Sequence, residues 1–362
     1  MRLERGIISS SQLMFLVAGY VQGSVLVVSY SNAITKQYTW LVVLSGLVIS
    51  IPVAMAYVAL ARKFPSKNLV QINNIVYGSY LGKLVSALYI WFFYSVSCLM
   101  LTYVGNIIKN YMMPETPKFA ICILFACICA WAVRNGIEVL ARTSVIFDMI
   151  VLSVILITFV LLLKDMEITN FLPFLGLSLK DFIQGTHIMV AIPFCQIVVF
   201  LMIIPYVNKG VEAKKSVVLG LIIGGVSILI DTVRNTAVLG VASAIMVSPS
   251  IESVRLIDLA EIITRLEMLV IIIFLITMFI KITVMYYATV FAIAQSFNLR
   301  SYKPLVLPIG SLIISFSMMI FDSSAENVEF GTRIGPIFTL PFELGLPLLT
   351  FLVAKIRKLP KK

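Results

Sequence analysis

The chain has very little charge for its length. Only 12% of its 362 residues are Asp, Glu, Lys or Arg and 60% are hydrophobic, whereas about 25% charged residues is usual in soluble globular domains. Apolar runs of about twenty residues, the length of helix that crosses a hydrocarbon core, follow one another between short polar connectors. The composition excludes an ordinary soluble domain and predicts an all-α polytopic membrane protein.

Residues that carry chemistry are also scarce. There is one histidine, and no phosphate-binding glycine loop, HExxH motif, nucleophile elbow or usefully spaced pair of carboxylates. The five cysteines lie in apolar runs without a recurring metal-ligand spacing, which predicts buried thiols. We therefore expect no enzymatic activity, no metal site and no cofactor.

The apolar runs predict about ten transmembrane helices in a single domain that spans residues 1–362. Their predicted bounds are 11–30, 41–61, 84–108, 119–133, 139–163, 182–207, 217–247, 269–297, 305–321 and 337–356. The first residues lack the small-residue cleavage site of a signal peptide, so we expect the first helix to be retained.

The basic residues predict the orientation. Of the 28 Lys and Arg residues, eighteen lie at the termini and in alternate loops on one side and eight in loops on the other side. By the positive-inside rule both termini are cytoplasmic. The net charge of +11 arises from this unequal distribution of basic residues between alternate loops, so it does not indicate nucleic-acid binding.

Two helices carry breakers near their middles. The first predicted span contains Gly19, Gly23 and Ser24, and the sixth contains Pro193. Breaks at matching positions indicate an inverted repeat, with repeats at about 8–164 and 178–357 and a binding site where the half-helices meet. A packing GxxxG motif in the first span and an ordinary proline kink in the sixth remain alternatives.

The predicted ligand site combines both breaks with an aromatic residue of the third span. An anionic group of the ligand would face the half-helix N-terminus near Gly23 and Ser24. The candidate ligand-binding residues are Gly19, Gln22, Gly23, Ser24, Tyr94, Pro193, Phe194 and Gln196.

Ionisable residues at bilayer depth cost about 2.5 to 3.5 kcal/mol each, so each needs a partner or a cavity. Asp231 and Arg234 stand at i and i+3 and could neutralise each other, as a purely structural pair. We expect Lys281 near the middle of the membrane, compatible in depth with Asp148. His187 and Glu343 are expected in the outer third. The predicted intramembrane charge network comprises Lys281, Asp148, Asp231, Arg234, Glu343 and His187.

Two connectors have helical periodicity. Residues 64–78 are expected to form an interfacial helix on the cytoplasmic side, with Leu69, Ile72, Ile75 and Val76 on its apolar face. Residues 251–263 are expected to form a short exterior helix over the outer entrance.

Several short motifs resemble one family. They are ISSSQL at 8–13, RKFP at 62–65, IPF at 192–194, FLMIIPY at 200–206, FIKI at 279–282 and YYA at 286–288. Together they resemble the B subunits of bacterial spore germinant receptors, in the amino acid–polyamine–organocation transporter superfamily. The family often has Gly-Glu after the proline region, where this chain has Cys195 and Gln196, so a coupling carboxylate is missing there.

The resemblance implies a LeuT-like five-plus-five fold in the spore inner membrane. It also implies receptor A and C subunits as partners and a small germinant such as an amino acid, sugar or nucleoside. The leading hypothesis is a germinant-sensing subunit with a transporter-like central pocket. The alternatives are a secondary transporter of amino acids or related small solutes, and an assembly scaffold.

The residue Lys281 has two possible roles. Its ammonium could take the place that a coupling cation occupies between spans one and eight in sodium-coupled relatives, with Asp148 or exposed carbonyl groups as partners. Alternatively, it forms a structural ion pair between helices.

Overall fold

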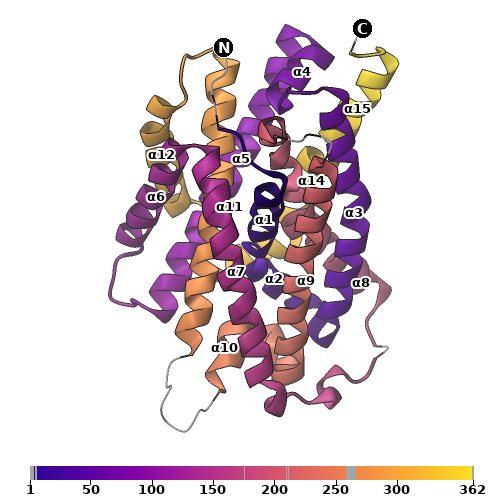
Figure 1. Ribbon diagram of the computed structural model, residues 1–362. Helices are drawn as coiled ribbons and strands as arrows, with labels where there is room; N and C mark the ends of the chain where they lie inside the picture. The colour runs from indigo at the N-terminus through magenta and orange to yellow at the C-terminus, as the bar shows by residue number, and fades with distance from the viewer. Residues whose placement is uncertain are drawn as a thin grey trace.

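The computed structural model describes residues 4, 6–174, 176–208, 210, 212–257 and 266–360. Within these residues the secondary structure is helical, apart from an isolated parallel bridge between Ile8 and Val207. Figure 1 shows a tall bundle with both ends of the chain at one end, here called the termini end. The opposite end, which carries helix α10 (Pro249–Arg255), is called the α10 end. The predicted all-α class is confirmed.

The described residues contain eight helical runs that are long and apolar enough to cross a membrane, and a shorter apolar run at Lys303–Met319. The first long run, Ser10–Lys63, has 54 residues, more than one crossing needs, and the chain turns within it at Lys36, where φ is 50°. Counting this run as two crossings and including the shorter run gives the ten that the sequence predicts.

The crossings are built from helices of very different regularity. In chain order they are α1 (Ser10–Gln22) with α2 (Val28–Thr35), α3 (Thr39–Lys63), α5 (Ser79–Tyr111), α6 (Lys118–Asn135), α7 (Ile137–Leu161), α8 (Leu179–Met189) with its continuation, α9 (Ala213–Leu239), α11 (Glu267–Ser296), α12 (Val306–Met319), and α13 (Ser324–Glu329) with α14 (Gly335–Leu340) and α15 (Leu346–Ile356).

The first crossing is interrupted where the sequence predicts. Helix α1 begins at a capping box, in which Ser9 Oγ accepts the Gln12 N–H at 3.1 Å and Gln12 Oε1 accepts the Ser9 N–H at 2.8 Å. It ends at Gln22, and after a turn at residues 23–24 a 3₁₀ turn, Val25–Val27, leads into α2. Gly19 lies inside α1 rather than at the break.

The sixth crossing is interrupted at Pro193. Helix α8 continues as a π turn, Val190–Phe194, and then as a 3₁₀ segment, Cys195–Met202. Proline lacks an N–H and clashes with the preceding turn, so the regular α-helical ladder cannot pass through this point. Both predicted breaks are therefore confirmed. The repeat bounds of 8–164 and 178–357 remain a prediction.

The last crossing begins earlier than predicted. Two π turns, Phe330–Ile334 and Pro341–Gly345, join α13, α14 and α15 into one apolar run from Glu326 to Ile356. The predicted bounds of 337–356 were too short, because glycine and proline in this region read as helix breakers. Glu343 consequently lies near the middle of the crossing, and its expected position in the outer third is wrong.

The two amphipathic connectors both contain helices. Helix α4 (Leu69–Tyr77) forms as expected, but Leu69, Ile72 and Val76 are completely buried against the bundle, and only Ile75 is exposed. Asn68, the N-cap residue of α4, donates a hydrogen bond from Nδ2 to Oε1 of Gln295 in α11 at 2.6 Å. The apolar face of α4 thus packs on protein, and its position at the membrane interface remains a prediction. The predicted exterior helix forms over Pro249–Arg255, and residues 258–263 lie outside the described residues.

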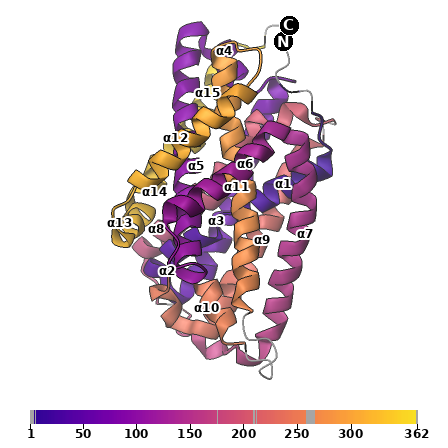
Figure 2. The same ribbon diagram turned by 90° about the vertical axis from the view of Figure 1, so that its left-hand side faces the viewer.

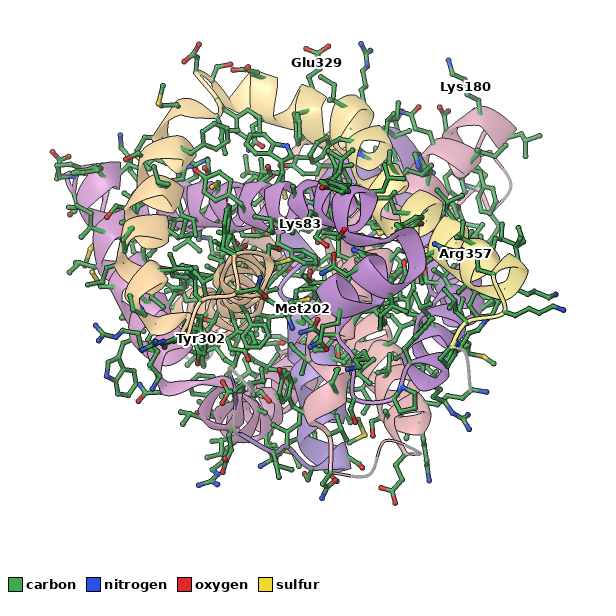
Figure 3. The ribbon with its side chains drawn as sticks, turned by 90° about the horizontal axis from the view of Figure 1, so that it is seen from above. Lys83, Lys180, Met202, Tyr302, Glu329 and Arg357 are labelled. Carbon is green, nitrogen blue, oxygen red and sulfur yellow. The ribbon has the colours of Figure 1, made fainter. Side chains whose placement is uncertain are left out.

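Seen along the bundle, Lys180 and Glu329 project outward at the rim, whereas Met202 lies near the centre (Figure 3). Figure 2 shows α7 and the orange α11 running side by side toward the α10 end, and α1 contacts α7, α9 and α11. The interior is therefore formed by α1, the sixth crossing and their neighbours.

Candidate functional site

The two broken crossings contact each other, as the repeat hypothesis requires. The first crossing packs on the irregular part of the sixth, where Tyr20 Oη donates to the Gln196 carbonyl at 3.4 Å. The Tyr20 ring meets the Phe200 ring edge to face, with centroids 5.4 Å apart. The breaks therefore lie side by side.

A pocket lies where the breaks meet, and we call it the central pocket. Its empty volume, including the open space at its mouth, is about 390 Å³, and its walls come from the first, third, sixth and last crossings. Its lining residues are Val27, Val96, Leu99, Met100, Tyr103, Ile192, Gln196, Phe330, Gly331, Gly335, Phe338 and Thr339.

One predicted ligand-binding residue lines the central pocket. Gln196 is 2% exposed, and its Oε1 has no hydrogen-bond partner among the described residues. Buried polar atoms are rarely left unpaired, so this oxygen is available to a ligand or to water. Ile192 and Val27, which flank the two breaks, line the pocket as well.

The predicted aromatic residue of the third crossing does not line the central pocket. Tyr94 Oη donates to the Leu312 carbonyl of α12 at 3.0 Å, which turns this ring away from the central pocket. Tyr103, which lies farther along α5, lines the pocket instead. Both tyrosines lie in an apolar helix, and nothing in the spacing of polar residues marks which face is central.

Phe194 and Pro193 do not line the central pocket. The Phe194 ring lies against α3, where a Cβ on Gly46 would be 3.4 Å from it. Pro193 belongs to the π turn and acts through the backbone that it interrupts. The predicted lining role of Phe194 is therefore corrected to a packing role.

The glycines of the first crossing are contact points between helices. A Cβ on Gly23 would come within 2.7 Å of the Thr277 carbonyl oxygen and 2.8 Å of Lys281 Cβ. A Cβ on Gly19 would meet an Asp148 carboxylate oxygen, and Ile280 Cδ1 at 2.7 Å. Neither glycine faces open space, so α1 approaches α7 and α11 closely here.

Lys281 lies at the break of the first crossing. Its side chain is completely buried, its Nζ donates to Ser24 Oγ, and it stands over the Tyr20 ring at 5.1 Å from the centroid. Glu343 of the last crossing is also buried, but it forms no ion pair with Lys281 in the described structure. The expected partner Asp148 is not within ion-pair distance in the described structure.

Glu343 and Asp148 are both deeply buried and incompletely paired. Glu343 is 1% exposed, and its Oε1 has no hydrogen-bond partner in the described part of the chain. Neither carboxylate oxygen of Asp148 has one either, and this carboxylate packs on Gly19. Such groups are costly inside a membrane and are commonly functional.

Asp231 and Arg234 form the structural pair that their spacing allows. Arg234 donates to Asp231, and also to Thr158 Oγ1 at 2.7 Å and Asn235 Oδ1 at 3.0 Å. Asp231 additionally accepts from Asn235 and Ser250. This network ties α7, α9 and α10 together at the α10 end.

His187 stands apart from the network. It is only partly buried, on α8, where it lines a shallow surface hollow with Leu179, Lys180, Ile183 and Gln184. Within the described residues no group of three or more His, Cys, Asp or Glu is placed to hold a metal ion.

A second, larger pocket lies toward the α10 end, and we call it the α10-end pocket. Its empty volume, including the open space at its mouth, is about 750 Å³. Gln22, predicted for the central site, lines this pocket instead. The other lining residues are Val25, Leu26, Val28, Ser29, Asn32, Val151, Ile155, Ser227, Ile228, Asp231, Thr232, Asn235, Val247, Ser248, Pro249, Ser250, Ile251, Val270, Ile273, Phe274 and Thr277.

Two solved transporter structures share this architecture. Mhp1, a nucleobase-cation-symport-1 family transporter in a closed conformation with bromovinylhydantoin bound, matches with a TM-score of 0.67 at 12% identity, over 91% of this chain and 75% of that chain. A Na⁺-coupled sialic acid symporter in a substrate-bound outward-open state matches with a TM-score of 0.66 at 12% identity, over 92% and 78%. At this identity the likeness shows the fold alone, and the predicted LeuT-like fold is confirmed.

Sequence comparison gives the family. The chain is 26% identical over 361 residues to spore germination protein KB of Bacillus subtilis (strain 168), covering 98% of this chain and 96% of that protein. It is 22% identical over 365 residues to spore germination protein YndE of the same organism, covering 98% of each. A family model described as "Spore germination protein" matches residues 7–326. The chain is thus an integral membrane protein with a transporter-like fold, and it belongs to the spore germination protein family.

Proposed function

We propose that this chain is the germinant-sensing membrane subunit of a spore germination receptor, and that it binds a small nutrient in the central pocket. The observation that carries the proposal is the pocket itself, which is enclosed by both broken crossings and receives the unpaired Oε1 of Gln196. Half-helices that meet around a buried pocket are where transporters of this architecture hold small solutes. The whole-length likeness to germination proteins supports a sensing role.

The receptor context completes the proposal. The relatives include spore germination proteins A2 and B2 of Bacillus subtilis (strain 168), and we infer that this chain assembles with A and C receptor subunits. It would lie in the spore inner membrane with the termini end toward the spore core, as the distribution of basic residues predicts. The germinant would be an amino acid, a sugar or a nucleoside.

Lys281 places its side-chain amino group beside the first break. Its ammonium donates to Ser24 and lies between α1 and α11, so we propose that it replaces the coupling cation of sodium-dependent relatives. A fixed cation would make ligand binding independent of sodium.

The experiment is a thermal-shift screen of amino acids, sugars and nucleosides on the purified full-length protein, followed by two neighbouring substitutions. Val27→Phe places a ring in the central pocket, whereas Val28→Phe places the same ring in the α10-end pocket. We expect a nutrient to raise the melting temperature of the wild type and of Val28→Phe but not of Val27→Phe. A nutrient that still stabilises Val27→Phe would contradict binding in the central pocket.

A second candidate, a secondary transporter, is favoured by the fold shared with the two symporters. Purified protein in proteoliposomes would be supplied with the radiolabelled nutrient found in the screen. Accumulation above that of Val27→Phe liposomes would support transport, and binding without accumulation would support the sensor. Absence of both would support the scaffold alternative.

A further inference from the structure

The α10-end pocket is separate from the central pocket, and no residue lines both. Its walls come from the first crossing on both sides of the break, from α7, α9 and α11, and from α10 with the residues just before it. In Figure 1 this region lies near the lower end of the bundle, where α9, α10 and α11 meet. Any ligand there would touch the break from the side opposite the sixth crossing.

Four hydroxyl groups of this wall are already used as hydrogen-bond donors. Each donates to a backbone carbonyl three or four residues earlier in the chain, so toward a ligand it offers only lone pairs. These bonds join Ser29 to Leu26 at 2.6 Å, Ser227 to Ile223 at 2.7 Å, Thr232 to Ile228 at 2.7 Å and Thr277 to Phe274 at 2.9 Å.

Two buried amides add unpaired acceptors. Gln22 and Asn32 are each 3% exposed, and Gln22 Oε1 and Asn32 Oδ1 have no hydrogen-bond partner among the described residues. The hydrogen bond that the Gln22 side-chain amide donates fixes which of its ends is free. Its Nε2 donates at 3.1 Å to Ser227 Oγ, whose own hydrogen is used by a carbonyl, so Oε1 must be the free end.

The charge of the pocket is balanced. Asp231 is paired with Arg234 and also accepts from Asn235 and Ser250, so it leaves no net negative charge for a cation. An ammonium ion would lose its hydration here without an unpaired anion to compensate it. A carboxylate would likewise lose its hydration without an unpaired cation to compensate it. The wall therefore suits a neutral molecule that donates hydrogen bonds at one end and is apolar elsewhere.

We propose that the α10-end pocket is a second ligand site, which binds a neutral small molecule with a hydroxyl or N–H donor on an apolar body. Gln22 and Asn32 accept its hydrogen bonds, and the Val, Ile, Leu and Phe side chains of the wall bury its body. Such a ligand would join the first crossing to α9 and α10. The site excludes zwitterionic amino acids, and it stands whether or not the central pocket senses a germinant.

The test uses 3-azidobenzyl alcohol as a photoreactive probe on the purified full-length protein in nanodiscs, with peptide mapping of the label. We expect labelling of wall peptides from α7 and α11, around Val151 and Phe274. Benzyl alcohol should compete at about three- to tenfold lower concentration than benzyl methyl ether, the value of one neutral hydrogen bond. The ether partitions more readily into lipid, so partition alone would give the opposite order.

Two pairs of matched variants test whether the alcohol preference and the photolabel arise in the α10-end pocket. Gln22→Leu should abolish the preference for the alcohol, whereas Gln37→Leu should keep it. Gln37 also has an unpaired Oε1 and one amide donor bond, to the Leu172 carbonyl at 3.4 Å, but lies outside the pocket. Val28→Phe should remove the label from both wall peptides, and Val27→Phe should leave it.

Two results would overturn the proposal. One is equal competition by the alcohol and the ether in the wild type. The other is full labelling of the wall peptides in Val28→Phe. This result would overturn the proposal even if Gln22→Leu does not fold. Because Val27→Phe and Val28→Phe affect different pockets, failure of this site is distinguishable from failure of the central pocket.

Discussion

Two clusters of buried charge lie inside the bundle, and they are built differently. Around Asp231 and Arg234 both carboxylate oxygens and the guanidinium group have partners. Around Lys281 the ammonium is held by a hydroxyl and a ring, and Glu343 and Asp148 keep unpaired oxygens. Proteins rarely leave such atoms unpaired without a use for them. We therefore propose that the first cluster serves structure and the second serves function.

The largest effect is expected from Lys281→Met. The substitution removes the charged hydrogen bond to Ser24, worth about 1.5–3 kcal/mol, and the contact of the ammonium with the buried Tyr20 ring, worth about 2 kcal/mol. Denaturant titration in mixed micelles measures the loss of unfolding free energy. Lys281→Met should also abolish the nutrient-induced thermal shift. A stable variant that keeps this shift would reduce Lys281 to a structural residue.

The structural cluster should behave in the opposite way. Arg234→Met alone should cost about 3 kcal/mol, because Asp231 keeps only the Asn235 and Ser250 donors. Combining it with Asp231→Leu should restore stability to near the wild-type value and leave the nutrient-induced shift unchanged. Loss of that shift in a stable double variant would show that this cluster also serves the central pocket.

Gly19→Ala tests how closely the first crossing approaches the functional cluster. The added methyl group would meet the Asp148 carboxylate and Ile280, so we expect a loss of about 1–3 kcal/mol in the same titration. The control is Gly345→Ala, because a Cβ on Gly345 has nothing within 4 Å. Equal effects of the two substitutions would mean that the contact between α1 and α7 is loose.

The smallest effect is expected from Asp148→Asn. This carboxylate has no hydrogen-bond partner and does not pair with Lys281, so a neutral side chain of the same shape should change the unfolding free energy by less than about 1 kcal/mol. A loss as large as that of Lys281→Met would restore Asp148 as the partner of Lys281.

The sequence predicts the helices and their breaks well, because these depend on local chemistry. Apolar length gives the ten crossings, and Gly23 and Pro193 give the breaks. The spacing of Asp231 and Arg234 gives their ion pair. In contrast, the predicted last crossing was too short. Glycine and proline usually end a helix, but here two π turns continue the helical run through them.

The lining of the site could not be predicted in the same way. Each residue turns a helix by about 100°, so Gln22 and Val27, on either side of the break, face different pockets. Tyr94 and Tyr103 lie on one apolar helix, and only packing against α12 and the last crossing separates them. The depth of Glu343 was missed because the last crossing was predicted too short.

The most direct test of the functional cluster is the response of the purified protein to sodium. Its melting temperature would be measured while sodium chloride replaces choline chloride at constant ionic strength. Since Lys281 supplies the charge beside the first break, the account predicts no change, with or without the bound nutrient. A saturable rise would contradict it, because a bound sodium ion stabilises the folded state by about 2.7 kcal/mol at one hundred times its dissociation constant.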